Sequence, residues 1–302
     1  MVAQNSSRIL VTGVSGPIGT ALLPSLNARG FQVTRLVRGP ASGERQISWD
    51  PGKPLPPERV SGFDAVVHLA GESIVGRWSE AKKGRIRNSR ISPTQHLVES
   101  LTKAKDRPRV LITASAIGYY GDRGDEILRE NRPPGEGFLA EVCREWEAAS
   151  QPAAQAGIRT VQMRTGLVLS PVGGALQKML LPFRMGLGGN MGSGRQWWSW
   201  INVQDWVEAL HHILKRDLLQ GAVNLVAPRP VTNAEFTKTL AAVLSRPAIF
   251  PMPAFAARLA FGQMADELLL ASQRVEPAKL ISSGYTFQHS DLKTALQAIL
   301  KR

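Results

Sequence analysis

Three glycines near the N-terminus have the spacing of a phosphate-binding turn. Gly13, Gly16 and Gly19 follow the apolar run 9–11 and precede a segment with helical character. A tight turn from strand to helix needs residues without a Cβ, and the free N–H groups and dipole at a helix start favour an anion. Pro17 suits that start because a first-turn N–H has no intrahelical partner. The order strand, glycines, helix therefore predicts a site for the pyrophosphate of a dinucleotide.

A basic residue ends the second expected strand, residues 32–38, where dinucleotide-binding folds place the group that meets the adenosine ribose. The strand ends in Arg38, Arg35 precedes it, and the first acids downstream, Glu44 and Asp50, lie outside it. An acidic residue would repel a ribose 2′-phosphate, whereas a guanidinium pairs well with phosphate. The sequence therefore predicts NADP rather than NAD as the cofactor. The alternative is that both arginines are solvated surface residues.

Strands and helices alternate over the first half of the chain. The expected strands are 61–71, 109–115 and 159–169, and the expected helices run from about 79 to 105 and from about 138 to 156. Nearly all-apolar strands that alternate with helices are typical of a parallel sheet covered on both faces. We therefore expect an α/β protein with a Rossmann-type, doubly wound parallel sheet, to which one more strand returns near 222–227.

The character of the chain changes after Ser170. Residues 173–200 are rich in glycine and tryptophan, which indicates a loop-dominated region over the carboxyl edge of the sheet, and the last third is mostly helical. We expect an NADP-binding domain over residues 1–170 and a smaller, mainly helical substrate-binding lobe over 171–302.

The glycines and tryptophans of residues 186–200 have a more specific interpretation. The glycines allow movement, and Trp197, Trp198 and Trp200 supply apolar area that excludes water. This segment would form a cover over the nicotinamide end of the site, with Arg195 as a cationic handle for an anionic or polyhydroxyl substrate. The alternative is that the tryptophans belong to a static core between the two lobes.

Composition narrows the class of protein. The chain has 302 residues, 43% of them hydrophobic, which is enough for a large core. It has no stretch long enough to span a bilayer and no apolar signal core, so we expect a cytoplasmic protein, or one in the lumen of an organelle, without a membrane partner. We expect a monomer or a homodimer. A single cysteine, Cys143, excludes an internal disulfide and a multi-cysteine zinc site, and no metal is expected. The formal net charge is +13, but the basic residues are scattered, few aromatics lie among them and no nucleic-acid-binding motif is present. These features disfavour nucleic acid as a partner and favour a small-molecule substrate.

Motifs over nearly the whole chain resemble one known family. The extended short-chain dehydrogenase/reductases of the epimerase/dehydratase group share a set of landmark motifs. This chain has segments that resemble them at residues 12–19, 68–71, Ser115 before 119–121, and 200–205. The atypical epimerase-like subgroup, some of whose members carry the label cell-division-inhibitor-like, resembles residues 71–74 with Trp78, 181–189 and 284–289. The resemblance implies a Rossmann fold, NADP binding, a C-terminal domain of unassigned function and no securely known substrate.

The chain departs from that family in its catalytic pair. The family uses Tyr-x-x-x-Lys, in which the lysine charge lowers the pKa of the tyrosine so that its phenolate acts as a base. The residues four positions after the three tyrosines Tyr119, Tyr120 and Tyr285 are Arg123, Gly124 and His289. Apolar residues of the helix that begins at Phe138 fill the expected places of the pair.

The remaining candidates for catalysis are Ser115, Tyr119, Tyr120 and Glu72. Ser115 would contact the nicotinamide or the substrate, or take part in catalysis. One of the two tyrosines would replace the missing base, with Arg123 or Arg164 as the positive charge; the alternative for both tyrosines is packing or hydrogen bonding. Glu72 would be an acid or base, or would orient its loop.

Cofactor contacts are expected from the glycine turn, the ends of the strands and the long helix. The residues are Gly13, Ser15, Gly16, Pro17, Ile18, Gly19, Val37, Arg38, His68, Leu69, Ala70, Gly71, Ser89, Arg90 and Arg164. His68 is interpreted as a structural residue beside the adenosine. Ser89 and Arg90 would contact a phosphate or a ribose, or form a solvated salt bridge.

Two functions from different classes remain open. The first is an NADP-binding, epimerase-like oxidoreductase that acts on an unidentified small substrate, sugar-like or nucleotide-linked. The second is a non-catalytic NADP(H)-binding sensor or regulatory protein. The missing Tyr/Lys pair favours the sensor, whereas the tryptophan-rich cover favours a small-molecule pocket and hence an enzyme.

Overall fold

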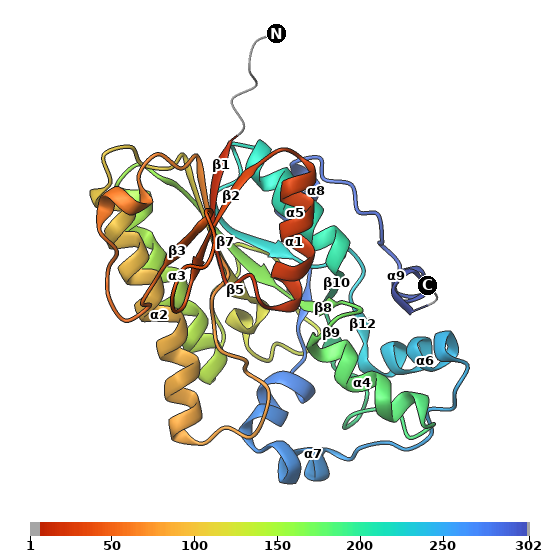
Figure 1. Ribbon diagram of the computed structural model, residues 1–302. Coiled ribbons are helices and arrows are strands. Elements are labelled where there is room, and N and C mark those ends of the chain that lie inside the picture. The colour runs from red at the N-terminus through yellow and green to blue at the C-terminus, as the bar shows by residue number, and fades with distance from the viewer. Residues whose placement is uncertain (1–6, 301–302) are drawn as a thin grey trace.

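A seven-stranded parallel sheet forms the centre of the fold (Figure 1), in a computed structural model that describes residues 7–300. Its strand order is β11-β7-β5-β4-β1-β2-β3. The strands are β1 (Arg8–Thr12), β2 (Gln32–Val37), β3 (Gln46–Ser48), β4 (Ala65–His68), β5 (Val110–Ala116), β7 (Arg159–Thr165) and β11 (Gly221–Leu225). The chain builds outward from β1 through β2 and β3 and then crosses to β4 on the other side of β1. This reversal opens a crevice at the carboxyl ends of β1 and β4, where such sheets bind ligands.

Helices cover both faces of this sheet, so the predicted Rossmann-type, doubly wound architecture is confirmed. The helices α1 (Pro17–Ala28) and α5 (Val203–Lys215) lie on one face, and α2 (Glu80–Lys103) and α3 (Phe138–Gln155) lie on the other (Figure 1). Successive residues of β1 point to opposite faces: Ile9 and Val11 pack with α1 and α5, and Leu10 packs with α2 and α3. A strand buried on both faces is a continuous apolar run, which is why these strands could be predicted.

Hydroxyl side chains cap the starts of two helices. The Ser79 hydroxyl accepts a hydrogen bond from the backbone N–H of Lys82 at 3.2 Å and begins α2. The Thr232 hydroxyl accepts from the N–H of Glu235 at 3.2 Å and begins α6 (Asn233–Leu244). Each hydroxyl satisfies one N–H that the first helical turn leaves without a partner.

The prediction of a single strand over 159–169 is wrong. Strand β7 ends at Thr165, and β8 (Leu167–Leu169) pairs with β10 (Trp200–Asn202) outside the central sheet. Gly166 lies at the break, where a Cβ would come within 2.5 Å of the carbonyl oxygen of Ser199. The apolar run is continuous, but the backbone turns where it passes close to another segment, and apolar patterning does not report such a turn.

The C-terminal lobe is mainly helical, as predicted, but residues 173–200 contain more helix than expected. The helix α4 (Gly174–Arg184) lies in that segment and packs with α6 and α9 (Leu292–Leu300) around Leu176, Phe236 and Leu296. The other elements are η1 (Pro57–Val60), η2 (Ile117–Tyr120), β6 (Ile127–Leu128), β9 (Trp197–Trp198), β12 (Val231–Thr232), α7 (Ala254–Phe261), the π-helix η3 (Ala265–Leu270), β13 (Arg274–Val275) and α8 (Ala278–Ser282).

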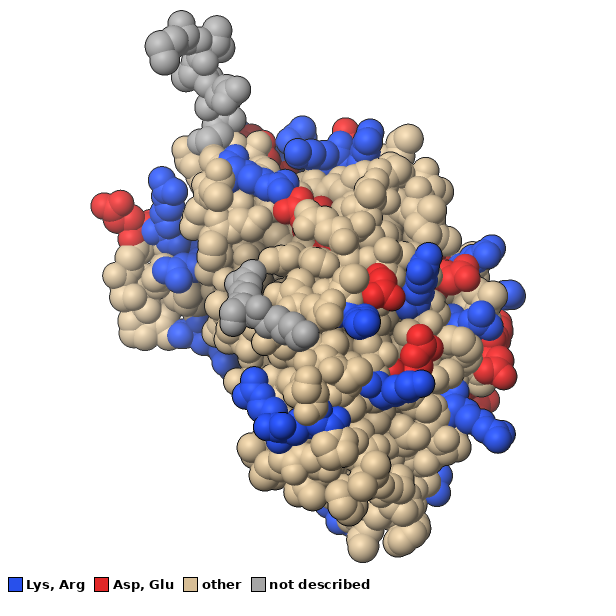
Figure 2. Space-filling model, turned by 90° about the vertical axis from the view of Figure 1, so that its right-hand side faces the viewer, with Lys and Arg blue, Asp and Glu red and all other residues tan. Residues whose placement is uncertain are grey.

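Charge is dispersed over the face that Figure 2 presents, which is the right-hand side of Figure 1. Basic side chains there are separated by uncharged surface and interspersed with acidic ones. This is the pattern of solvated charge rather than of a continuous basic band. None of the helices within residues 7–300 is long and apolar enough to cross a membrane.

Candidate functional site

A cleft of about 1160 Å³ lies at the carboxyl ends of β1, β2 and β4. It brings together the predicted residues Gly13, Ser15, Gly16, Val37, Arg38, Leu69, Ala70, Gly71, Glu72 and Ser89. Pro17, Ile18 and Arg90 line a second pocket that adjoins the cleft, as does Ser115. Gly19, His68 and Arg164 line neither space. One groove, large enough for a dinucleotide, is therefore lined by the glycine turn, the basic end of the second strand and the long helix.

The glycines of the turn differ in what they make room for. A Cβ on Gly13, whose φ is +72°, would lie 2.5 Å from the carbonyl carbon of Leu69, and one on Gly19 would lie 2.4 Å from the Cα of Val14. A Cβ on Gly16 would meet only the carbonyl oxygen of Gly13 at 3.9 Å and otherwise point into open space. Gly13 and Gly19 thus serve the packing of the chain, whereas Gly16 leaves bare backbone on the cleft side.

The start of α1 fits an anion at this bare backbone. Gly16 is the N-cap of α1 and supplies no side-chain hydrogen bond to the first turn. The first N–H groups of the helix therefore remain as donors beside the cleft, at the positive end of the helix dipole. These features fit the pyrophosphate of a dinucleotide cofactor.

The far end of the cleft holds Arg38 and Trp49. Arg38 is exposed and forms no hydrogen bond or ion pair with any residue in the range 7–300, so its guanidinium is available to a ligand. Trp49 is 4% exposed, and its Nε1 is buried without a hydrogen-bond partner among the same residues. The sequence reasoning missed Trp49, because the only signal was an isolated aromatic just beyond the second strand.

His68 lies beneath the cleft rather than in it. Its Nδ1 accepts from the Thr12 hydroxyl at 2.7 Å, and its Nε2 lies 3.1 Å from the Thr94 oxygen. Because the Thr94 hydroxyl donates to the carbonyl oxygen of Arg90 at 2.6 Å, its oxygen must accept from His68, which assigns the proton to Nε2. Burial lowers the pKa of His68 to about 4. The Thr12 oxygen in turn accepts from the N–H groups of residues 69 and 70, so this chain of bonds shapes the cleft floor.

Glu72 is an ionised, paired carboxylate. Its Oε1 accepts from Lys82 Nζ at 2.6 Å and from Arg85 Nε at 3.3 Å. The hydrogen bond from Lys82 lowers the pKa of Glu72, and Arg85 lowers it further. A carboxylate held in this form does not supply a proton at neutral pH.

The adjoining pocket, about 450 Å³, lies between the carboxyl edge of the sheet and the C-terminal lobe. Most of its wall is apolar, with side chains from α2, α3, α4, the loop after β4 and the π-helix η3. Trp197 and Trp198 line it, whereas Trp200 is fully buried and donates from Nε1 to the carbonyl oxygen of Arg229 at 3.1 Å. Arg195 is exposed and is not part of the lining.

Leu139 and Cys143 occupy one face of α3, four residues apart, and both line this pocket. Their spacing equals that of the two residues in a Tyr-x-x-x-Lys pair, but both side chains are apolar. Burial raises the pKa of the Cys143 thiol to about 12, so the thiol stays protonated at neutral pH. Neither residue supplies a base.

Ser115, at the end of β5, is the hydroxyl at the junction of cleft and pocket. It donates from Oγ to Oε1 of Glu147 at 2.7 Å. Glu147 follows Cys143 by one further turn of α3 and is held by Arg164 through Nε at 2.8 Å and Nη2 at 2.9 Å. Although burial by itself lowers the pKa of Arg164, the hydrogen bonds with Glu147 raise it above the ordinary value. Arg164 is thus a permanent cation behind the pocket, and it lines neither the pocket nor the cleft.

The sequence reasoning missed Glu147. The available signal was its place four residues after Cys143 on the pocket face of α3. Its hydrogen-bond partners, Ser115 and Arg164, come from β5 and β7, and no local sequence pattern predicts that they meet Glu147.

The two neighbouring tyrosines contribute to the fold on the far side of Arg164. Tyr120 is fully buried, donates its hydroxyl to Oδ1 of Asn224 at 2.8 Å and accepts from Arg164 Nη1 at 3.0 Å. Burial raises the pKa of Tyr120 to about 12. The Tyr119 ring lies against the Arg164 guanidinium, with 3.4 Å between the ring centroid and the guanidinium carbon. Neither tyrosine lines the pocket.

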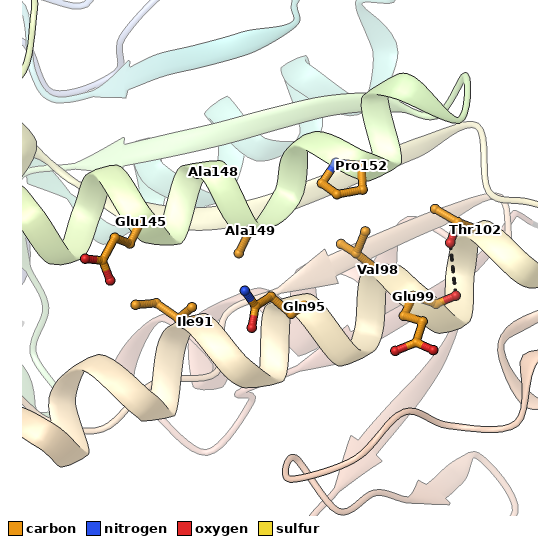
Figure 3. A pocket seen from close by; sticks show the side chains of 9 residues that line it. All are labelled: Ile91, Gln95, Val98, Glu99, Thr102, Glu145, Ala148, Ala149 and Pro152. Atoms are coloured by element: carbon orange, nitrogen blue, oxygen red, sulfur yellow. Dashed lines mark hydrogen bonds between the residues drawn. The ribbon is translucent and has the colours of Figure 1, made fainter.

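A further groove lies between α2 and α3 (Figure 3). Figure 3 shows Ile91, Gln95 and Val98 on α2 opposite Ala149 and Pro152 on α3. Its lining contains no basic side chain and no glycine turn, and it shares no residue with the cleft. It does not fit the pyrophosphate.

The chain has clear relatives among known proteins. Residues 9–225 match the model of the NAD dependent epimerase/dehydratase family, and residues 252–299 match a domain of unknown function, DUF1731. An epimerase family protein of Mycobacterium bovis is 43% identical over 290 residues, which cover 95% of this chain and 96% of that protein. The human epimerase family protein SDR39U1 is 38% identical over 297 residues, which cover 97% of this chain and 99% of that protein.

Solved structures agree with these matches. The crystal structure of human SDR39U1 (isoform 2) with NADPH has a TM-score of 0.90 at 38% identity and covers 98% of this chain and 99% of its own. A nucleoside-diphosphate sugar epimerase from Corynebacterium glutamicum has a TM-score of 0.82 at 38% identity, covering 98% of this chain and 58% of the other.

Proposed function

Because the chain belongs to the NAD-dependent epimerase/dehydratase family, we propose that it binds NADP(H) in the cleft along β1, β2 and β4 and acts as an epimerase-like oxidoreductase on a small molecule in the adjoining pocket. The observation that carries the cofactor assignment is Arg38, which follows β2, lines the cleft and has no hydrogen-bond or ion-pair partner among residues 7–300. The human relative crystallised with NADPH supports the same choice. In this proposal residues 1–170 hold the cofactor and 171–302 complete the substrate pocket.

Different residues along the cleft would bind different parts of the cofactor and the ligand. The first turn of α1 would hold the pyrophosphate, with Gly16 giving access to the backbone, and Arg38 would pair with the 2′-phosphate. Bound NADP(H) supplies hydride exchange at its nicotinamide ring. Ser115 would hold a hydroxyl of the ligand at its Oγ, and Glu147 would orient that Oγ. The apolar wall of the pocket would exclude water.

A second candidate is the non-catalytic NADP(H) sensor. The observation that favours it is the pair Leu139 and Cys143, which place no base in the pocket. The high pKa of Tyr120 also keeps its hydroxyl protonated at neutral pH, and the lowered pKa of Glu72 makes its paired carboxylate a weak base. A sensor needs the cofactor site and a lobe that responds to whether the cofactor is bound, but it needs no proton relay.

Calorimetric titration tests the cofactor assignment. We expect NADPH to bind at least about tenfold more tightly than NADH, because a charge-assisted contact to phosphate contributes roughly 1.5–3 kcal/mol. Arg38→Asp should abolish that preference. Arg35→Asp is the matched control, since Arg35 lies on the same strand but not in the cleft lining, and should keep it. Equal affinities for the two cofactors in the unmodified protein would sink the assignment.

Turnover separates the enzyme from the sensor. NADPH oxidation would be followed over a panel of carbonyl compounds and NADP+ reduction over a panel of sugar nucleotides, with chromatography of the sugar products to detect an epimerisation that returns the hydride. Turnover that falls by about 10²-fold or more in Ser115→Ala, with an unchanged NADPH affinity, supports the enzyme. Tight NADPH binding without turnover of any member of the panel favours the sensor.

A further inference from the structure

The pocket next to the cofactor cleft offers a ligand almost no free hydrogen-bond donors. The hydroxyl groups of Ser115, Thr165, Ser170 and Ser199 all donate within the protein, over 2.7 to 3.3 Å. The indole N–H groups of Trp146, Trp197 and Trp198 do the same, to Thr94, Asp125 and the carbonyl oxygen of Leu269. The lining amide Gln273 donates from Nε2 to the carbonyl oxygen of Gly121 at 3.1 Å. A ligand therefore meets hydroxyl, indole and amide groups that already donate within the protein.

The charged side chains of the lining also have partners within the protein. Arg90 is the one basic residue among the described residues that line the pocket. Its Nη1 donates to the carbonyl oxygen of Ile86 at 2.9 Å, its Nη2 donates to that of Glu72 at 2.9 Å, and its guanidinium lies over the Trp146 ring at 5.2 Å.

The one acidic residue of this lining, Glu267, is also occupied. Its carboxylate accepts from the N–H groups of Phe138 and Leu139 at 3.1 and 2.7 Å, at the start of α3. The lining thus has one side chain of each charge, so the pocket has no surplus of positive charge for a diphosphate.

The rest of the wall is apolar and comes from both lobes. Ile74, Ile117, Val168, Met179 and Leu268 are half-buried side chains that line the space. A sugar placed here would lose water from its hydroxyl groups without gaining protein partners, which is unfavourable. An apolar ring would lose only unfavourable hydration.

From this saturated lining we propose that the pocket takes an uncharged, predominantly apolar ring compound with one hydroxyl, which donates to Ser115 Oγ. The proton of Ser115 is held by Glu147, so the free capacity of Ser115 is as an acceptor. This inference rests on the proposed function, because the nicotinamide would share the pocket and leave room for a small ring system. It departs from the sugar-like or nucleotide-linked substrate that the sequence predicts.

The start of α4 is the part of the pocket where backbone N–H groups could bind a phosphate. It therefore allows a test between an apolar ring compound and a sugar nucleotide as the ligand. Gly174 and Ala175 line the pocket there, and the N-cap residue Gly173 makes no side-chain cap. UDP-glucose is therefore the informative competitor. Naphthylmethanol, an uncharged ring compound with one hydroxyl, is the matching probe.

The experiment is calorimetric titration of the full chain with each compound, with and without saturating NADP. We expect naphthylmethanol to bind at least about tenfold more tightly than UDP-glucose. Met179→Gln, on the pocket side of α4, should weaken naphthylmethanol about fivefold or more, because it places an unpaired amide in the wall. Met185→Gln is the matched control at the end of the same helix, where Met185 is 57% exposed and lies outside the lining, and should leave the affinity unchanged.

The outcomes separate this inference from the proposed function. UDP-glucose binding as tightly as naphthylmethanol, no binding of naphthylmethanol, or equal affinities in Met179→Gln and Met185→Gln would each overturn the inference while NADPH affinity still supports the cofactor site. Naphthylmethanol binding without any NADP(H) binding would overturn the proposed function and leave the apolar pocket standing. Circular dichroism of both variants confirms that each is folded.

Discussion

Glu147 and Arg164 face each other in a bidentate pair, Nε to Oε1 at 2.8 Å and Nη2 to Oε2 at 2.9 Å, with side-chain exposures of 11% and 5%. The pair joins α3 to β7 behind the pocket that adjoins the cleft. Its remaining hydrogen bonds hold Ser115 from one side and Tyr120 from the other. One buried ion pair thereby positions the hydroxyl that faces the ligand.

Removal of one partner of this pair should be strongly destabilising. Arg164→Met leaves the Glu147 carboxylate buried without its counter-ion, and we expect a loss of about 3–5 kcal/mol in the free energy of unfolding by urea denaturation. The double variant Arg164→Met, Glu147→Leu should lose less than the sum of the two single changes. Arg123→Met is the control, because the Arg123–Glu126 pair is 25% and 31% exposed and should cost less than about 1 kcal/mol. Additive single effects would show that the pair is not coupled.

The glycines of the turn should separate ligand binding from folding. Gly16→Ala should leave the thermal midpoint nearly unchanged but weaken NADPH about tenfold or more, because its Cβ enters the cleft and not the protein. Gly13→Ala should instead lower stability, since its Cβ would overlap the Leu69 backbone and its φ of +72° disfavours other residues. Thermal denaturation measures the stability of each variant, and NADPH titration measures its affinity for the cofactor. A Gly16→Ala variant with full affinity would contradict the placement of the pyrophosphate.

The neighbouring tyrosines form a matched pair for the assignment of roles. Tyr120→Phe removes the hydrogen bond to the buried Oδ1 of Asn224 and one of the bonds of Arg164 Nη1, and we expect a loss of about 1–3 kcal/mol in unfolding free energy. Tyr119→Phe should change that quantity by less than about 0.5 kcal/mol, because within residues 7–300 its hydroxyl has no hydrogen-bond partner. NADPH affinity should be unchanged in both. The reverse order of stabilities would remove Tyr120 from the network.

Stability should fall as the pH drops from about 6.5 to about 4. The unfolded chain protonates His68 near its ordinary pKa of about 6.5, whereas the buried, folded side chain stays neutral down to a pKa of about 4. The unfolded state therefore binds more protons in this window, and the free energy of unfolding decreases there by up to about 3 kcal/mol from His68. Burial also lowers the pKa of His211 to about 4, so that residue adds to the slope.

Denaturation curves across that pH window give the measurement. His68→Gln should reduce the slope of unfolding free energy against pH, whatever the absolute stability of the variant, because it removes one of the three histidines whose pKa burial lowers. A slope equal to that of the unmodified protein would show that His68 does not remain neutral in the folded state.

Local signals were enough to predict the cofactor half of the site. The apolar run into Gly13, the strand that ends in Arg38 and the hydroxyl caps Ser79 and Thr232 all act within a few residues of chain. Their consequences, a turn, a strand end and a helix start, depend on backbone conformation and burial period, which the residue types themselves specify. The doubly wound sheet follows from the alternation of these elements.

Only the tertiary structure decided the chemistry of the pocket. Ser115 meets Glu147 across 32 residues of sequence, and Tyr120 meets Asn224 across 104. Whether a hydroxyl is free for a ligand or already committed depends on such partners, and they are set by the packing of α3 against β5 and β7. The break at Gly166 has the same origin, because only the approach of the Ser199 backbone turns the chain there. Residue types determined which groups the site could contain, and close packing determined which of them a ligand can still reach.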